Sequence, residues 1–396
     1  MSRNARRRDP ALGPKTKLEL NEGHFSLRLV GVAVFIAIAA LAFGIGINDL
    51  LRTQTGWQQV EASASKTGIA QEFALCYNIG QTEAEAKAEL RGVSACYSET
   101  LDRAYRVLSN TPQEGYVNLS DLNAQPNTAI AVDPLLYAAF QTVEASGSRL
   151  PYFAPLLGQY WSLFACANDQ EAESFDPDRS EEAAQFAAEV AGFAQDPEAV
   201  QVKLLPGNTL RLEVSPAYLD YARENELDSF VDLGLLLNAF ICDAVADALE
   251  AGGYTNGYVT SFDGFARALC KEEFGLNVFD LKEGSPAQLG TALYDGPGTV
   301  VSCRAFPVLD QDEVNYFTYS DGTVVPPYLN HRGRLHAACA SLNTFSSSHS
   351  AGALALLTLA AYAGEDSGFP TLEEVSWVSG ENGQIHFHGE DFRFPE

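Results

Sequence analysis

The sequence predicts an α+β fold, and three observations indicate this class. Hydrophobic residues make up 46% and charged residues 19% of the 396 residues, a globular composition that excludes a mostly disordered chain. Strand-like and helix-like segments are interspersed without the regular alternation that builds a parallel sheet. Turn signals typical of hairpins recur between the strand-like segments. A chain of this length can bury a large core.

Helix signals dominate the first half of the predicted domain. Apolar residues at helical spacing, among many alanines and glutamates, predict a long helix. Asp133 suits an N-cap and Pro134 a first turn, and Gly147 closes the helix that they open. Ser180 caps a third helix, with acids in its first turn. The segments expected here are a strand over 69–77, a helix over 83–108, a turn or short strand over 116–123, and helices over 133–145 and 180–193.

Strands are more frequent in the second half. Pro206-Gly207-Asn208 is a turn signal that joins two short strands within 200–214, and Ser320-Asp321-Gly322 marks another turn. Glycines end both helices of this half. The further segments expected here are strands over 230–233, 257–262, 299–306 and 315–319, helices over 235–251 and 350–363, and one or two strands over 374–394.

The charge of the chain excludes one class of partner. Lys and Arg number 25 and Asp and Glu 52, which gives a net charge of −27. Basic residues gather in the first 28 positions, so the rest of the chain is more acidic still. A body this acidic repels phosphate, and we therefore expect no binding to nucleic acid.

A membrane anchor is predicted near the N-terminus. Residues 29–47 form an uncharged run long enough to span a bilayer core. The basic residues precede this run, which predicts that the N-terminus stays in the cytoplasm and that the main domain lies outside the cell membrane. The predicted organisation is a basic tail over 1–28, a single-pass anchor over 29–51, a polar stalk over 52–65 and one extracytoplasmic domain over 66–396.

Two other interpretations of the apolar run are weaker. A cleaved signal peptide needs a small-residue motif close to the run, and Ala62-Ser63-Ala64 lies further on. A buried core helix seldom has so long an uncharged stretch directly after a basic tail. The seven cysteines could form disulfides outside the cell, in a pairing that the sequence leaves open. Their spacing is not that of a zinc site.

Several motifs, taken in order, resemble those of one enzyme family. The central one is Val231-Asp232-Leu233-Gly234, followed by Asp243 and a helix. The others are Ser120-Asp121-Leu122-Asn123 before Val132-Asp133, Ala154-Pro155-Leu156 with Trp161, the strand 208–212, Tyr328-Leu329-Asn330 with Arg332-Gly333-Arg334, and the segment 350–356. Together they resemble the FAD:protein FMN transferases, also called the thiamine-biosynthesis lipoprotein family, from about residue 67 to the C-terminus.

The resemblance implies that the domain lies outside the cytoplasmic membrane and that its reaction depends on a metal. Members bind FAD and a divalent metal, usually magnesium, and attach FMN to a threonine of a partner protein. By this resemblance the residues expected to contact a cofactor are Asp232, Gly234, Asp243, Asp263, Asn330 and Arg332. Three of these residues have a structural alternative: Asp232 caps a helix, Asp243 is a solvated helix position, and Arg332 pairs with a surface acid.

The match is poorest where the family binds metal and diphosphate. The family's metal-binding Asp and Thr correspond to Gly352 and Leu356, which offer no side-chain oxygen for magnesium. Its second glycine corresponds to Leu235 and its lysine to Asn238. Its Asn-Ala-Gly-Gly-Asp segment falls on 260–264, and its hairpin histidine falls near Pro327 or Tyr328. We therefore expect no bound magnesium, we assign no catalytic residue, and FAD remains a candidate ligand.

The hypothesis from the sequence is a degenerate flavin-transferase fold without catalytic activity that acts as a binding or scaffold module at the membrane, with a protein partner in a redox assembly. The alternative is an active FMN transferase with replacement ligands at Asp263 or Asn330. A hydrolase built on Ser346 to Ser350 with His349 is disfavoured, because no nucleophile elbow is present. The pair His386 and His388 lies on one face of a strand but lacks a third metal ligand.

Overall fold

The computed structural model describes residues 55–62, 67–82, 84–364 and 375–395. The chain divides into two units at Thr53 and Gln54, and the described residues belong to the second. The predicted basic tail and membrane anchor lie outside the described residues. Among the residues that are described, no helix is both long and apolar enough to cross a membrane.

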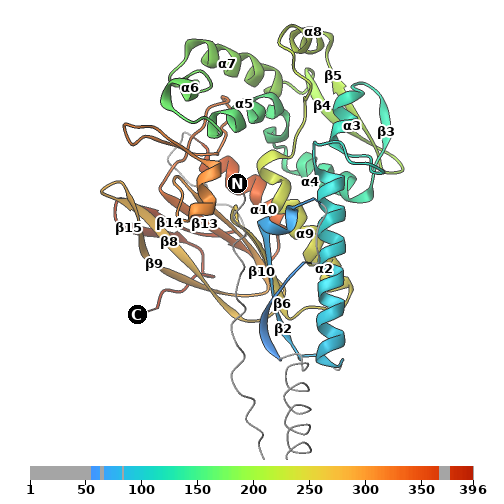
Figure 1. Cartoon of the computed structure of the whole chain (residues 1–396), viewed down its shortest axis with the longest axis vertical. Coiled ribbons are helices and arrows are strands. Elements are labelled where there is room, and N and C mark those ends of the chain that lie inside the picture. Colours follow the sequence, from blue (N-terminus) through green and yellow to red (C-terminus); the bar gives the residue numbers. More distant parts are fainter. Residues whose placement is uncertain (1–54, 63–66, 83, 365–374, 396) are drawn as a thin grey trace, which may run out of the picture. The chain divides into compact units, whose positions relative to one another are not determined.

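The centre of the second unit is an antiparallel sheet in the order β1-β2-β6-β7-β10-β13-β14-β15 (Figure 1). Neighbours in this order are antiparallel throughout, which confirms the α+β class. The strands are β1 (Gly56–Val60), β2 (Phe73–Ile79), β6 (Gly257–Ser261), β7 (Phe265–Ala268), β10 (Gly298–Arg304), β13 (Ser341–Ser346), β14 (Ser376–Glu381) and β15 (Gln384–His388).

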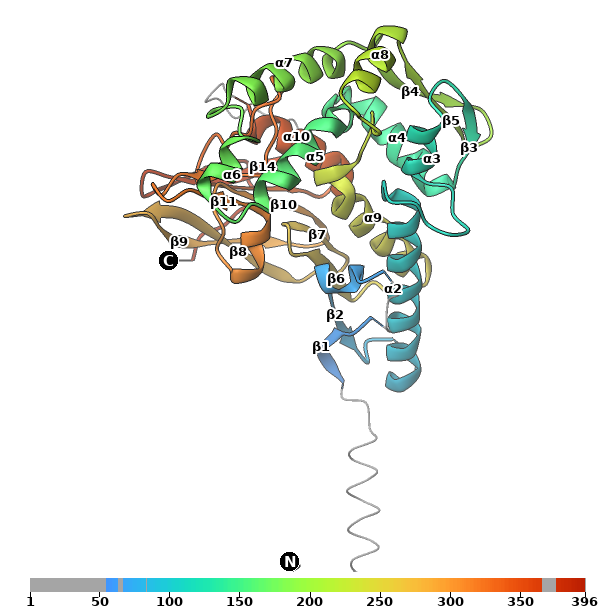
Figure 2. The same ribbon diagram turned by 45° about the horizontal axis from the view of Figure 1, so that its top comes forward.

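Three helices cover one face of this sheet: α2 (Ala86–Leu108), α9 (Leu237–Ala251) and α10 (Ala351–Tyr362). In Figure 2, α9 and α10 lie between the sheet and an outer layer of helices. The outer helices and their neighbours are α4 (Pro134–Ser146), α5 (Ala154–Phe164), α6 (Asp169–Glu173), α7 (Glu181–Gln195) and α8 (Pro216–Glu224). α10 is apolar on every side because it packs against both layers, as a buried helix must.

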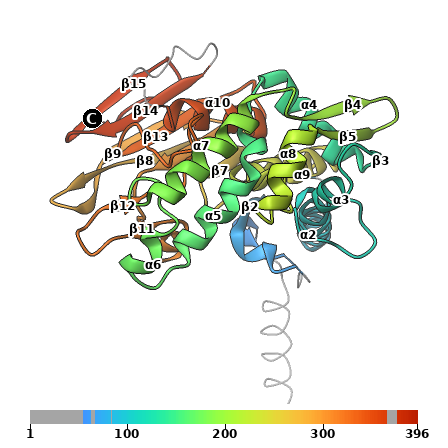
Figure 3. The same cartoon turned by 90° about the horizontal axis from the view of Figure 1, so that it is seen from above.

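A separate sheet of three strands, β3 (Ala129–Ala131), β5 (Thr209–Val214) and β4 (Val200–Leu205), lies beside α3 (Leu119–Ala124) and α4. The long hairpin of β8 (Glu273–Lys282) and β9 (Ser285–Asp295) packs on β13 and β14 (Figure 3). A second small core, which includes Val278, Tyr294 and Phe345, fills the space between them. The remaining pieces are the ribbon of β11 (Phe317–Thr318) and β12 (Val324–Val325) and the 3-10 turns η1 (Ile69–Glu72), η2 (Leu150–Phe153), η3 (Gly234–Leu236) and η4 (Asp310–Asn315).

The predicted helices with clear caps are confirmed. Asp133 accepts a hydrogen bond from the backbone N–H of Leu135, and Gly147 ends α4 in the left-handed region. Ser180 and Ser350 cap α7 and α10 through their side chains. The two strands within 200–214 and the two after 374 are also present.

Some predictions were wrong. The segment 116–123 contains helix α3 and not a strand, and Asn118 and Asp121 form its capping box. Part of the predicted stalk forms the edge strand β1. The segment 230–233 has no strand. The hairpin of β8 and β9 was missed, although Glu283 and Gly284, both with positive φ, are a turn signal between alternating segments.

Candidate functional site

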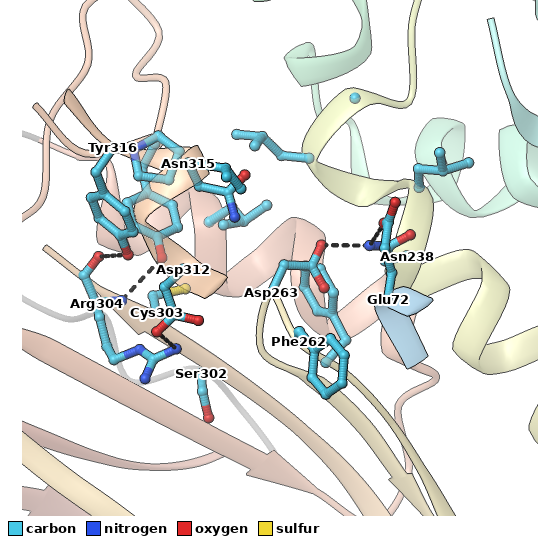
Figure 4. Close-up of a pocket in the computed structure, with 18 of the residues that line it drawn as sticks. Glu72, Asn238, Phe262, Asp263, Ser302, Cys303, Arg304, Asp312, Asn315 and Tyr316 are labelled. Carbon is cyan, nitrogen blue, oxygen red and sulfur yellow. Dashed lines mark hydrogen bonds and ion pairs between the residues drawn. The ribbon is translucent and has the colours of Figure 1, made fainter. Parts of the chain in front are cut away.

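A cavity of about 500 Å³ opens beside the start of α9. Its walls come from η1, the turn between β6 and β7, the end of β10, η4 and one residue of α5. Figure 4 shows two polar groups on opposite sides of it, one around Asn238 and one around Arg304. These elements are far apart in the sequence, so the cavity is a product of the tertiary fold.

The first group consists of two carboxylates that share one amide. The Nδ2 atom of Asn238 donates hydrogen bonds to Glu72 and to Asp263, each at 3.0 Å. Asp263 sits in the tight turn between β6 and β7, which needs the next residue to be Gly264. That glycine has φ +106°, and a Cβ there would lie 2.1 Å from the carbonyl oxygen of Ser302.

The pKa of Asp263 is raised to about 6. The largest cause is desolvation of the carboxylate by the surrounding protein, and the negative charge of Glu72 raises the pKa further. Hydrogen bonds from Ser261 and Asn238 lower the pKa. Asp263 is an exposed residue that lines the cavity. The charged neighbour that acts on Asp263 is thus another acid.

The second group contains a cation that is already neutralised. Arg304 pairs with Asp312 at 3.2 Å, and the side chains are 20% and 5% exposed. Asp312 also accepts the backbone N–H groups of Val308 and Leu309. The hydroxyl of Tyr316 donates to the carbonyl oxygen of Arg304, and burial raises the pKa of this phenol, which therefore stays neutral.

Large apolar side chains border the cavity where it opens. Trp161, Phe262 and Val314 line it and are 44%, 42% and 70% exposed. Exposed apolar residues of this size that gather around one concave surface are typical of a binding site.

The structure divides the six predicted cofactor residues among three places. Gly234 and Asp263 line the cavity. Asp232 lies next to Gly234 and accepts its backbone N–H at 2.9 Å and the side-chain N–H of Asn110 at 3.2 Å. Burial raises the pKa of Asp232. Asp232 therefore stabilises the turn before η3 and α9, but the N-caps of these helices are Leu233 and Leu236, so the interpretation of Asp232 as a helix cap was wrong.

Asp243 lies at the N-terminus of α10, away from the cavity. Its carboxylate accepts hydrogen bonds from the backbone N–H groups of Ala351 and Gly352 and pairs with Arg267 at 2.6 Å. The side chain is 13% exposed, so the interpretation as a solvated helix position was wrong. The carboxylate instead stabilises the positive end of the helix dipole.

The surroundings of Gly352 leave no room for a metal. A Cβ at this position would lie 2.4 Å from a ring carbon of Phe240, and Leu356 is 2% exposed. In the part of the chain that the structure describes, no three His, Cys, Asp or Glu side chains are grouped as a metal ion requires. These residues do not fit a magnesium ion at the N-terminus of α10.

Asn330 and Arg332 line a different cavity, of about 690 Å³, with Arg149 and Leu356. The Oδ1 atom of Asn330 accepts the backbone N–H groups of Arg332 and Arg334, which closes the turn. Asn330 is 4% exposed, so its amide shapes this loop. Leu359 borders both cavities.

The other candidate residues from the sequence are a serine–histidine pair, two histidines of one strand and the cysteines. The Oγ atom of Ser346 lies 2.8 Å from Nδ1 of His349, within hydrogen-bonding distance. Ser346 is 1% exposed and accepts backbone N–H groups, so this contact organises a turn and does not present a nucleophile. His386 and His388 lie in β15, as predicted, and both are exposed. The seven cysteines are free thiols.

Sequence reasoning missed Glu72, Arg304, Asp312 and Tyr316 as residues of the cavity. None of them belongs to a motif, and each reaches the site through a contact between distant segments. Asn238 was noted as a substitution, but its link between two carboxylates had no signal in the sequence.

Solved structures similar to this chain include ApbE proteins, two of which are flavin transferases. The chain has 16% identity to the ApbE protein of Thermotoga maritima, with a TM-score of 0.54 over 87% of this chain and 97% of that one. It has 14% identity to the flavinyl transferase ApbE of Pseudomonas stutzeri, with a TM-score of 0.52 over 85% and 94% of the two chains. For the flavin transferase ApbE of Vibrio cholerae the identity is 13% and the TM-score 0.50, over 85% and 97%. No family model and no curated protein matches the chain by sequence. The chain therefore has the ApbE fold.

Proposed function

We propose that this chain, which has the fold of the ApbE flavin transferases, is a membrane-anchored binding or scaffold module that has lost metal-dependent FMN transfer. Its domain would face the outside of the cell membrane and serve a protein partner in a redox assembly. The proposal rests on the residues around the N-termini of two helices, α9 and α10.

The observation that carries the proposal is the packing at the start of α10. The resemblance assigns the metal ligands of the family to the positions of Gly352 and Leu356. Phe240 fills the space in front of Gly352, and Leu356 is buried. Asp243, the nearby acid that matches the family, is engaged by Arg267 and by two backbone amides. A magnesium ion needs several oxygen ligands and water, for which this packing provides no space.

The cavity at the start of α9 also suits a diphosphate poorly. Asn238 stands where the family has a lysine, and it faces Glu72 and Asp263. Arg304 is paired with Asp312. A ligand with two phosphates would meet carboxylates without a compensating cation, which is unfavourable at close range.

One observation favours the alternative, an active transferase. Magnesium is often held by one or two carboxylates together with substrate phosphates, and Glu72 and Asp263 form such a pair beside an open cavity. Asn330 is less suitable, because its side-chain oxygen is engaged by backbone amides.

The test is a FAD assay on the full-length chain in neutral detergent micelles. The chain is incubated with FAD, with and without Mg²⁺, and FMN and AMP are separated by chromatography, with the Vibrio cholerae enzyme as positive control. We expect no Mg²⁺-dependent cleavage and no strengthening of FAD binding by Mg²⁺ in a fluorescence titration. Formation of FMN and AMP, or micromolar binding that depends on Mg²⁺, would overturn the proposal, and Asp263→Asn would then show whether Asp263 supplies a ligand.

A further inference from the structure

The charge of the cavity beside α9 indicates what it attracts. Three carboxylates line it, those of Glu72, Asp263 and Asp312, against the single guanidinium of Arg304. Arg304 and Asp312 neutralise each other. The remaining two acids, Glu72 and Asp263, are linked through the amide of Asn238, and no described cation forms an ion pair with either of them. The wall that contains η1 and the β6–β7 turn is therefore negative.

The polar atoms on this wall accept hydrogen bonds. Both carboxylates are acceptors when ionised. Asn238 is 8% exposed, and its Oδ1 atom is buried without a hydrogen-bond partner among the described residues. Its N–H donors are already turned towards the two acids. A ligand that donates hydrogen bonds and carries positive charge complements this wall, whereas a phosphate does not.

The rim of the cavity is apolar, which indicates that the uncharged part of the ligand is apolar too. Trp161, Phe262 and Val314 expose large apolar surfaces at the same cavity. Flat aromatic rings stack on such side chains, and a cation is further attracted by an aromatic face. The volume of about 500 Å³ lies within the range of small-molecule sites and exceeds that of a single lysine or arginine side chain.

We infer that this cavity binds a small organic cation with a flat aromatic body, its charged N–H groups against Asp263 and Glu72 and its ring against Trp161 and Phe262. The inference rests on the proposed function, since it treats the cavity as the binding site of the module. It departs from the family resemblance, because the ligand is a cation and not the dinucleotide FAD.

The test compares three-ring probes of different charge. Proflavine is cationic, lumiflavin is neutral and FMN carries a phosphate. The full-length chain in neutral detergent micelles, with EDTA and physiological salt, is titrated with each while fluorescence is recorded. We expect proflavine to bind roughly tenfold more tightly than lumiflavin, and FMN to bind most weakly, since one charge-assisted contact is worth about that factor.

Variants test separately how the acidic residues and the aromatic residue contribute to probe binding. Asp263→Asn and Glu72→Gln should each weaken proflavine roughly tenfold and leave lumiflavin unchanged. Glu224→Gln removes an equal charge from an exposed position in α8 and should change neither. Trp161→Ala should weaken both probes, whereas Trp57→Ala, at an equally exposed tryptophan of another cavity, should weaken neither.

The inference fails if FMN binds as tightly as proflavine, or if Glu224→Gln acts like Asp263→Asn. It fails equally if Trp57→Ala rather than Trp161→Ala weakens the probes. These readouts are independent of the FAD assay. Cleavage of FAD would overturn the proposed function alone, and an inverted order of the probes would overturn this inference alone.

Discussion

Asn238 shows how one residue sets the character of the cavity. The resemblance places a lysine at this position, and a lysine ammonium beside Glu72 and Asp263 would offset one of their two negative charges. The amide of Asn238 instead bridges the two carboxylates through neutral N–H groups. Their repulsion remains and contributes to the raised pKa of Asp263. Asparagine at this position thus leaves both negative charges of the wall uncompensated.

The same residue scale yields a prediction on pH. The pKa of Asp263 is about 6, against 3.8 for an unperturbed group, so the folded chain holds this proton more tightly than the unfolded chain. The stability from Asp263 is fully present below about pH 3.8 and is lost as the pH rises through about 6. We expect the free energy of unfolding of Asp263→Asn, measured in urea, to rise relative to that of the original chain between pH 4 and 7.

A second variant checks the origin of this effect. The titratable groups that act with Asp263 are Glu72 in η1, Cys242 in α9 and Cys303 in β10, and burial keeps both thiols neutral. Glu72→Gln removes a negative charge that raises the pKa of Asp263, so it should narrow the pH range over which the stability contributed by Asp263 is lost. Parallel stability curves for the original chain and Asp263→Asn would contradict the prediction.

At the scale of the element, the packing of α10 is tight at the position that the resemblance assigns to a metal ligand. The helix is buried between α9, the sheet and the outer layer, and Phe240 of α9 contacts the backbone at Gly352. Asp243 and Ser350 cap its N-terminus. A larger residue at position 352 would have to displace an aromatic ring.

This packing predicts that a glycine-to-alanine substitution has opposite effects on the free energy of unfolding in α10 and in α5. Gly352→Ala should lower the free energy of unfolding by about 1–2 kcal/mol, because its Cβ would lie 2.4 Å from Phe240. Gly158→Ala in α5 meets nothing within 4 Å and should raise it by up to about 1 kcal/mol. Urea unfolding of both variants measures the difference. Equal changes would show that the space before Gly352 is open.

At the scale of the whole molecule, two units are expected to have separate roles. The residues from Gln54 onward form a unit with its own core, and the predicted anchor precedes it. The uncharged run over 29–47 remains a prediction from the sequence. Its basic flank predicts the side of the membrane on which each unit lies.

Fractionation tests this organisation. In a bacterial host, the full chain should stay in the membrane pellet after a carbonate wash, whereas a chain that begins at Gln54 should be released, because it lacks the apolar run. Protease added to spheroplasts should digest the main unit of the full chain and spare an N-terminal tag. Release of the full chain by carbonate, or loss of the tag, would contradict the prediction.

Much of the fold could be predicted because local interactions determine it. Asp133, Ser180 and Ser350 cap their helices through backbone atoms two or three residues away, so each signal is contained in the sequence around it. The turn at 206–208 specifies its hairpin in the same way. The ordered motifs also indicated the ApbE fold, which the solved structures bear out.

The candidate site was decided by tertiary structure. Glu72, Asn238 and Asp263 meet across separations of 166 and 25 residues, and Arg304 becomes unavailable to a ligand because η4 brings Asp312 to it. Asp243 had the same motif signal as Gly234, yet it caps α10 while Gly234 lines the cavity. The sequence by itself determined the class of fold and the elements with clear caps or turns, since those depend on neighbours along the chain. Charge, access and packing at the site depend on which distant segments meet, and only the folded chain decides that.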